Sequence, residues 1–278
     1  MTPHEHDLGL VHDLGTLRRR NVLRLLVGAG VAVVAGCSAD ETPSASGSTP
    51  TPSATSSTPS STPSSTSSAV DVDEIPQETA GPYPGDGSNG PNVLTESGIV
   101  RSDLTKSFGS ASGVASGVPL TVELVVLDAA KDTALAGAAV YLWHCDALGR
   151  YSLYSEGAED ENYLRGVQAA DADGKVTFTT IFPAAYSGRW PHIHFEVYAS
   201  LSEATAAGKI SATSQLAFPS APCEAVYATN GYDGSSQNMS RTSLEDDGVF
   251  GEDDGVQQLA TVTGSVQQGF VARLTVGV

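Results

Sequence analysis

Beyond residue 70, hydrophobic and polar residues alternate over short stretches rich in β-branched and aromatic side chains. A period of two is typical of a β-strand with one buried face. Dipeptides typical of turns, such as Leu148-Gly149 and Asp173-Gly174, separate the stretches. No stretch sustains a long helical period, so the fold class is predicted to be all-β, with a β-sandwich favoured. The predicted strands cover residues 120–127, 140–143, 176–182, 193–198 and 270–276.

The N-terminus combines basic residues with a short apolar run. Arg19 and Arg20 precede the run 25–35, which is followed by Gly36 and Cys37. This order is typical of an export signal, and the run is shorter than the roughly 20 apolar residues that a membrane span needs. The arginine pair resembles a twin-arginine signal, and residues 34–37 resemble a bacterial lipobox. Residues 1–37 are therefore predicted to be a lipoprotein signal peptide, with an ordinary secretory peptide as the alternative.

Residues 38–69 are dominated by Ser, Thr and Pro. A segment with almost nothing apolar to bury cannot offset its ordering entropy, so it is predicted to be a disordered tether. Residues 70–278 then form the folded domain, which is long enough for one sizeable core. Together these parts predict a bacterial protein that is exported and either lipid-anchored at Cys37, on the outer face of the cytoplasmic membrane, or secreted.

The charge balance excludes one class of partner. The chain has 14 Lys and Arg against 32 Asp and Glu, a formal net charge of -18. Four of the basic residues lie in the N-terminal stretch 18–24, so residues 70–278 hold 10 Lys and Arg against 27 Asp and Glu and carry almost the whole net charge. Nucleic-acid binding requires clustered Lys and Arg to contact phosphates, and we therefore expect no nucleic-acid partner.

Two of the three histidines beyond residue 70, His192 and His194, lie in one predicted strand. Residues i and i+2 of a strand project from the same face, so the two imidazoles lie side by side. Such a pair forms half of a metal site. One way to complete it is Glu196, which shares that face and would produce a ferrous site of two histidines and one carboxylate, as in a cupin-like oxygenase.

Tyrosine is the other way to complete the site. Tyr186 lies six residues before His192, after a Pro183 that ends a strand, and Tyr151 follows the Gly149-Arg150 turn. Phenolate is a hard anionic ligand that suits ferric iron. However, a tyrosine more often simply packs, with its hydroxyl hydrogen-bonded, and these residues alone leave the choice open.

The order and spacing of several motifs resemble those of the intradiol ring-cleavage dioxygenases, a family that includes catechol, protocatechuate and hydroxyquinol dioxygenases. The resemblance spans most of residues 76–278. It implies the β-sandwich of that family with short helices and long loops, and a mononuclear non-haem Fe(III) cofactor. It also implies an oxidoreductase that uses O2 to cleave the bond between the two hydroxylated carbons of catechol-type aromatics, which yields muconate-type diacids. The motifs that carry it are 143–152, 164–168, 171–186 and 188–194.

Carried over residue by residue, the resemblance implies a ligand set of two tyrosinates and two histidines: Tyr151, Tyr186, His192 and His194. It implies that Tyr186 is the axial ligand that leaves the iron and accepts a proton. Arg189 would stabilise negative charge on the ring, and Gln215 would orient a polar group. Glu196 would then lie outside the ligand set.

Four other residues carry weaker signals, two from the resemblance and two from the cysteine count. Residues 78–83 resemble a Gly-Pro-Tyr segment of the family, so Tyr83 either lines the pocket or packs in a loop. His144 is expected to be structural. Cys145 and Cys223 are expected to form a disulfide because an exported domain with an even pair invites one, with two buried thiols as the alternative.

Partners and competing functions follow from the same features. The expected partners are a small aromatic diol and O2, with membrane contact only through Cys37. The helical dimerisation segment of the catechol dioxygenases is absent from the sequence, so the oligomeric state stays open. The competing functions are the ferrous oxygenase that uses Glu196 and a non-catalytic, surface-displayed β-sandwich binding module.

Overall fold

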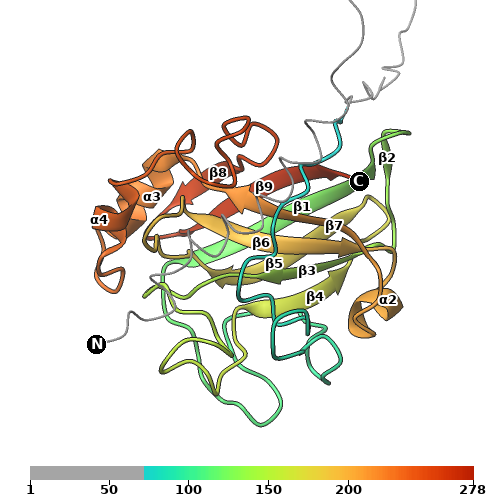
Figure 1. The fold of residues 1–278 in the computed structure, drawn as a ribbon, viewed down its shortest axis with the longest axis horizontal. Coiled ribbons are helices and arrows are strands. Elements are labelled where there is room, and N and C mark those ends of the chain that lie inside the picture. The colour runs from blue at the N-terminus through green and yellow to red at the C-terminus, as the bar shows by residue number, and fades with distance from the viewer. Residues whose placement is uncertain (1–71) are drawn as a thin grey trace, which may run out of the picture.

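The computed structural model describes residues 72–278, which form two β-sheets packed face to face (Figure 1). The first sheet has the order β2-β1-β9-β8, with β5 also paired to β1, and the second has the order β4-β3-β6-β7. β1 and β9 run parallel, whereas all other strand pairs are antiparallel. The strands are β1 (Pro119–Asp128), β2 (Thr133–Ala134), β3 (Ala139–Trp143), β4 (Arg165–Ala169), β5 (Lys175–Ile181), β6 (His192–Tyr198), β7 (Ile210–Ala217), β8 (Thr261–Ser265) and β9 (Gly269–Gly277).

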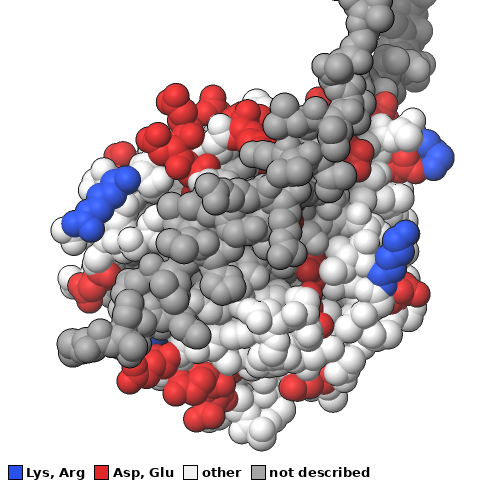
Figure 2. Space-filling view, viewed as in Figure 1, with Lys and Arg blue, Asp and Glu red and all other residues white. Residues whose placement is uncertain are grey.

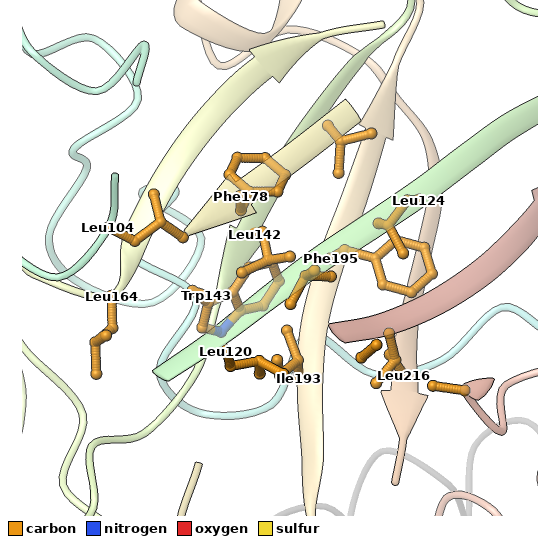
Figure 3. Close-up of a cluster of buried hydrophobic side chains, with 14 of the residues drawn as sticks. Leu104, Leu120, Leu124, Leu142, Trp143, Leu164, Phe178, Ile193, Phe195 and Leu216 are labelled. Atoms are coloured by element: carbon orange, nitrogen blue, oxygen red, sulfur yellow. The ribbon is translucent and has the colours of Figure 1, made fainter. Parts of the chain in front are cut away.

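Apolar side chains fill the space between the sheets. Along β1, every second residue from Leu120 to Val126 is buried, which is the alternation that the sequence showed. Figure 3 shows this cluster, in which Leu124, Leu142 and Phe195 come from strands of both sheets. Each such side chain contributes about 1.5–3 kcal/mol through removal of its surface from water. The all-β sandwich is therefore confirmed.

The five predicted strands correspond to β1, β3, β5, β6 and β9. The alternation did not reveal β2, β4, β7 or β8. β2 has only two residues, Arg165–Ala169 has little apolar periodicity, and Thr261–Ser265 has no fully buried residue. Each of these strands is defined by its neighbour rather than by its own pattern. Three short helices also lie outside the alternation: α2 (Leu201–Thr205), α3 (Ser220–Tyr227) and α4 (Ser235–Met239).

β6 is buried on both faces. One face, with Phe195, contacts the other sheet, and the opposite face carries the histidine pair. The chain after residue 72 crosses the strands of the four-stranded sheet on that outer side (Figure 1). Its backbone pairs with β7, since Glu78 N donates to Thr213 O at 2.7 Å. The outer face of this sheet thus becomes an enclosed site rather than a solvated surface.

The predicted disulfide between Cys145 and Cys223 is wrong: both residues are buried free thiols. Cys145 lies just after β3, where its Sγ contacts Ala184 O at 3.6 Å, and Cys223 lies in α3. Burial raises the pKa of both thiols, which keeps them protonated. The even number of cysteines was a compositional argument, and it carries no information about whether the two thiols are bonded in the fold.

Carboxylates are spread around the face in Figure 2, with only a few Lys and Arg side chains among them. Within residues 72–278, no helix is long and apolar enough to span a bilayer. The predicted signal peptide (1–37) and tether (38–69) lie outside the described residues.

Candidate metal centre

Two imidazole nitrogens meet at the start of β6. Nε2 of His192 lies 3.2 Å from Nε2 of His194, and both side chains are almost fully buried. The strand geometry accounts for this, since the two residues project from one face of a sheet that is covered from outside. The indole ring of Trp143, directly opposite His194 on β3, stacks on the His194 ring with centroids 5.0 Å apart and fixes its plane.

Tyr186 brings a phenol oxygen to the same place. Its hydroxyl lies 2.9 Å from Nε2 of His192. The residue follows β5 in an extended segment that α4 holds, because Ala185 N donates to Ser235 Oγ and Asn238 Nδ2 donates to Ala185 O. Tyr186 is only partly buried, so it is the most accessible of the converging side chains.

Tyr151 brings the second phenol oxygen, 3.5 Å from the Tyr186 hydroxyl. The turn before it is organised by Asp146, whose Oδ1 accepts hydrogen bonds from the backbone amides of Leu148 and Arg150, both at 2.9 Å. Gly149 has a φ of 79°, which favours glycine, and an added Cβ would lie 3.3 Å from Tyr186 Cβ. The Gly-Arg-Tyr sequence therefore allows the two tyrosines to approach each other.

The protonation of the histidines suits ligand binding. Nδ1 of His192 lies 2.6 Å from Trp190 O and must donate to it, which leaves an Nε2 lone pair facing the centre of the site in the neutral ring. Burial, followed by the positive charge of Arg189, lowers the pKa of His192. Burial and the neighbouring His192 lower the pKa of His194. Both imidazoles are thus neutral near pH 7, the form that binds metals.

The four donor atoms fit a metal ion. Ligands bound at about 2.0–2.1 Å to one ion lie roughly 3 Å from each other, and the three successive pairs of these atoms are separated by 3.5, 2.9 and 3.2 Å. Burial, followed by the neighbouring Tyr186 hydroxyl, raises the pKa of Tyr151, so a phenolate at this position requires a nearby cation. Two phenol oxygens and two imidazoles form a hard donor set that suits ferric iron.

Glu196 does not join this centre. Its Oε2 accepts a 2.6 Å hydrogen bond from the Tyr198 hydroxyl. No group of three or more His, Cys, Asp or Glu side chains in residues 72–278 is placed to hold a metal. The two-histidine-one-carboxylate arrangement therefore has no support in this part of the chain, although Glu196 does share the histidine face of β6.

Arg189 and Gln215 lie together beside the histidines. Arg189 Nη2 donates to Gln215 Oε1 at 2.6 Å, and Gln215 is directly opposite His194 in the pairing of β6 with β7. Gln215 Nε2 in turn donates to Thr79 O at 2.9 Å. Both side chains are almost fully buried, so they present polar groups in a site from which water is largely excluded.

Sequence reasoning missed Asp247, which forms a buried ion pair with Arg189, 3.0 Å from Nε to Oδ2. Its carboxylate also accepts from the backbone amides of Trp190 (2.6 Å), Val249 (2.8 Å) and Phe250 (3.2 Å). It ties the loop at 244–250 to the start of β6. No local signal in the acidic stretch around Asp247 distinguishes it from its exposed neighbours.

The segment 78–83 closes the site from outside. An added Cβ on Gly81 would lie 3.3 Å from His194 Cε1, and the Tyr83 ring packs on Tyr151 with centroids 4.9 Å apart. Tyr83 therefore lies against one of the donor residues. His144 lies elsewhere: Nε2 contacts Thr180 Oγ1 at 2.7 Å and Nδ1 contacts Cys145 O at 2.8 Å, which agrees with the expected structural role.

Comparison with known proteins defines the family. A protein-family model described as Dioxygenase matches residues 89–222. The intradiol ring-cleavage dioxygenase from Tetranychus urticae is 27% identical, with a TM-score of 0.53 over 66% of this chain and 87% of that chain. A second solved dioxygenase is 25% identical, with a TM-score of 0.58 over 74% of this chain and 94% of that chain. The chain belongs to the intradiol ring-cleavage dioxygenase family.

The third similar structure is the dioxygenase domain of a dioxygenase carbohydrate-binding protein fusion from Streptomyces sp. SirexAA-E, 24% identical, with a TM-score of 0.47 over 74% of this chain and 98% of that chain. The family match of this intradiol dioxygenase contains all four donor residues, Arg189 and Gln215, but not Asp247. Membership of this family makes the chain an enzyme, an oxidoreductase, and removes the non-catalytic binding module from consideration.

Proposed function

We propose that this intradiol dioxygenase holds one non-haem Fe(III) and cleaves catechol-type aromatics with O2 between their two hydroxylated carbons, releasing muconate-type diacids. The ligands in this proposal are Tyr151, Tyr186, His192 and His194. The observation that carries it is the convergence of two phenol oxygens and two imidazole nitrogens, with successive separations of 3.5, 2.9 and 3.2 Å.

Bound ferric iron would supply a Lewis acid that favours the deprotonated catecholate and draws electron density from its ring. The two tyrosines have different roles in accepting the substrate. Tyr151 is 2% exposed and packed between Tyr83 and His194, so it stays in place. Tyr186 is only partly buried, so less packing opposes its displacement, and its oxygen, once deprotonated, would accept a proton from a catechol hydroxyl.

Arg189 and Gln215 provide the electrostatics. The guanidinium is held by Asp247 through Nε and by Gln215 through Nη2, so its orientation is set before substrate binds. A preorganised cation in a buried site stabilises negative charge that develops on the substrate ring. Gln215, anchored to Thr79, orients a polar group of the substrate or of Arg189.

The visible spectrum of the purified, iron-loaded protein tests this function. We expect a broad tyrosinate-to-iron band that shifts when catechol is added anaerobically, followed by O2 uptake and a diacid product. His192→Ala and His194→Ala should lose iron, and Tyr151→Phe and Tyr186→Phe should lose or shift the band. His144→Gln and Tyr232→Phe are matched controls that should keep it, because the His144 ring contacts Cys145 and Thr180 and the Tyr232 hydroxyl bonds Val118 and Phe182. A colourless iron-loaded protein would refute the ferric two-tyrosinate site.

We also propose that the protein is exported and lipid-anchored at Cys37, so that its only membrane contact is this anchor. The support is the order of arginine pair, apolar run and small residues before the cysteine. Cys37→Ala in the full chain should move the enzyme from the membrane fraction to the soluble fraction. An unchanged distribution would contradict the anchor and leave the ring-cleavage proposal untouched.

A further inference from the structure

Arg165 is a buried arginine whose guanidinium donates five hydrogen bonds near the site. It is the first residue of β4, 1% exposed, and opposite Trp143 in the pairing of β3 with β4. Nε donates to Ser152 Oγ at 3.0 Å, and Nη2 donates to Ser152 O and Tyr83 O, both at 2.9 Å. Nη1 donates to Pro84 O at 2.8 Å and Tyr141 Oη at 3.1 Å.

All of these acceptors are neutral. No ion pair of Arg165 with a carboxylate occurs within residues 72–278, whereas the other fully buried arginine, Arg189, is paired with Asp247. Burying a cation without a counter-charge is costly unless its hydrogen bonds are satisfied, and here all three guanidinium nitrogens donate. The charge is accommodated by hydrogen bonds that join the segment 83–84 to Ser152.

Both segments adjoin Tyr151. Ser152 follows Tyr151 directly in the chain, while Tyr83 packs its ring on the Tyr151 ring. One guanidinium thus binds the backbone next to the donor residue and the backbone of the residue that packs on it. An added Cβ on Gly85 would lie 2.7 Å from Arg165 Nη1, which shows how closely the 83–85 segment approaches the guanidinium.

We propose that Arg165 is a positioning residue that sets the direction of the Tyr151 oxygen toward the donor centre and fixes the wall that Tyr83 presents to the substrate. This inference rests on the proposed iron site. A planar group with donors on both edges can hold two backbone segments at once, which a lysine ammonium cannot do with the same geometry. A small shift of a catalytic group is enough to lower turnover strongly.

The test compares Arg165→Lys with Arg101→Lys. Arg101 is a matched control because its guanidinium also binds backbone carbonyl groups at and near the start of β4. Nε and Nη2 donate to Arg165 O at 2.8 and 2.6 Å, and Nη2 also donates to Asn162 O at 3.1 Å. It contacts neither Tyr151 nor Tyr83 through these bonds. Both variants should unfold at lower denaturant concentration than the wild-type protein.

Only Arg165→Lys should shift the charge-transfer band of the iron-loaded protein, raise the KM for catechol and lower kcat, with kcat/KM falling about 10–100-fold. In the metal-free protein, amide hydrogen exchange at 83–85 and 151–153 should be faster in this variant alone. If Arg165→Lys fails to fold, Ser152→Ala removes one acceptor and should produce the same shift on a smaller scale.

An unchanged band, KM and exchange pattern in Arg165→Lys, with lower stability alone, would overturn the positioning role. Failure of the proposed function is distinguishable, because the wild-type protein itself would then lack the tyrosinate band.

Discussion

Arg189 Nη2 lies 2.6 Å from Gln215 Oε1, so the guanidinium is bound directly to β7, the strand that pairs with the histidine strand β6. The same guanidinium contacts Asp247 through Nε, at 3.0 Å. The guanidinium is therefore oriented by one neutral partner, Gln215, and one negative partner, Asp247. This relationship separates the part of the site that would bind metal from the part that would stabilise charge.

Because these two parts of the site are distinct, we expect the Arg189→Met enzyme to keep its iron but to lose turnover. All four donor residues stay in place, whereas the cation that stabilises charge on the ring is gone. We expect kcat to fall by about 10²–10³-fold, as for other losses of a preorganised donor. Iron content and the charge-transfer band measure the first half of the prediction, and steady-state kinetics with catechol the second. Loss of iron from this variant would contradict the division of roles.

The Arg189–Asp247 pair also predicts a rescue of stability. Arg189→Met alone leaves a buried carboxylate unpaired, which should lower the free energy of unfolding by about 3–5 kcal/mol. Adding Asp247→Asn removes that charge and keeps one oxygen, which can still accept from the backbone amides of Val249 and Phe250, whereas the bond from Trp190 N to the other oxygen is lost. The double variant should therefore be more stable than Arg189→Met in urea denaturation. Additive losses would show that the two side chains are not energetically coupled.

Glu196 predicts a specific pH dependence of stability in the metal-free protein. Burial raises its pKa from the ordinary value of 4.5 to about 7. The folded state therefore binds more protons than the unfolded state between these values. The stability contributed by the protonated carboxyl is present below pH 4.5 and is lost as the pH rises through about 7.

Glu196→Gln removes this titration. The difference in free energy of unfolding between the variant and the wild-type protein should grow in favour of the variant from pH 4.5 to pH 8, by up to about 3 kcal/mol. Urea titrations at several pH values measure it, and the other carboxylates cancel in the difference. A constant difference would show that Glu196 ionises normally. Iron binding should survive the substitution, since Glu196 lies outside the donor set.

The position of Gly81 indicates that the segment 78–83 leaves little space around His194. Gly81 has a φ of 71°, and its Cβ in Gly81→Ala would approach His194 Cε1 to 3.3 Å. Gly109→Ala is the matched control, because its φ is 68° and no atom lies within 4 Å of the added Cβ. Both variants carry a backbone cost of about 1–2 kcal/mol. Only Gly81→Ala should weaken iron binding in a competition with a chelator. Equal iron affinities of the two variants would show that the segment 78–83 moves to make room for the added methyl group.

The histidine pair and Tyr186 illustrate what could be predicted along the chain. Strand periodicity alone places His192 and His194 on one face, because residues two apart share a face whatever surrounds them. The Gly149-Arg150 turn places Tyr151 at a strand end for a similarly local reason. The all-β class followed from alternation in strands such as β1 and β6.

Residues without a local signal were missed. Asp247 lies in an acidic stretch and Arg165 in a strand with no alternation, and each acquires its role from partners 58 and 81 residues away at Arg189 and Pro84. The disulfide expectation failed for the same reason, since counting Cys145 and Cys223 says nothing of where each thiol lies.

Alternation and turn residues thus predicted the fold class, the same-face histidines and the residue types available for a ferric site. The packing of the sheets brings the Tyr186 oxygen to His192 and the Tyr151 oxygen to Tyr186, directs Glu196 to Tyr198, and places residues 78–85 over the site. Period and turn chemistry act between neighbours in the chain, whereas convergence of donors requires two packed sheets and a covering segment whose contacts are distant in sequence.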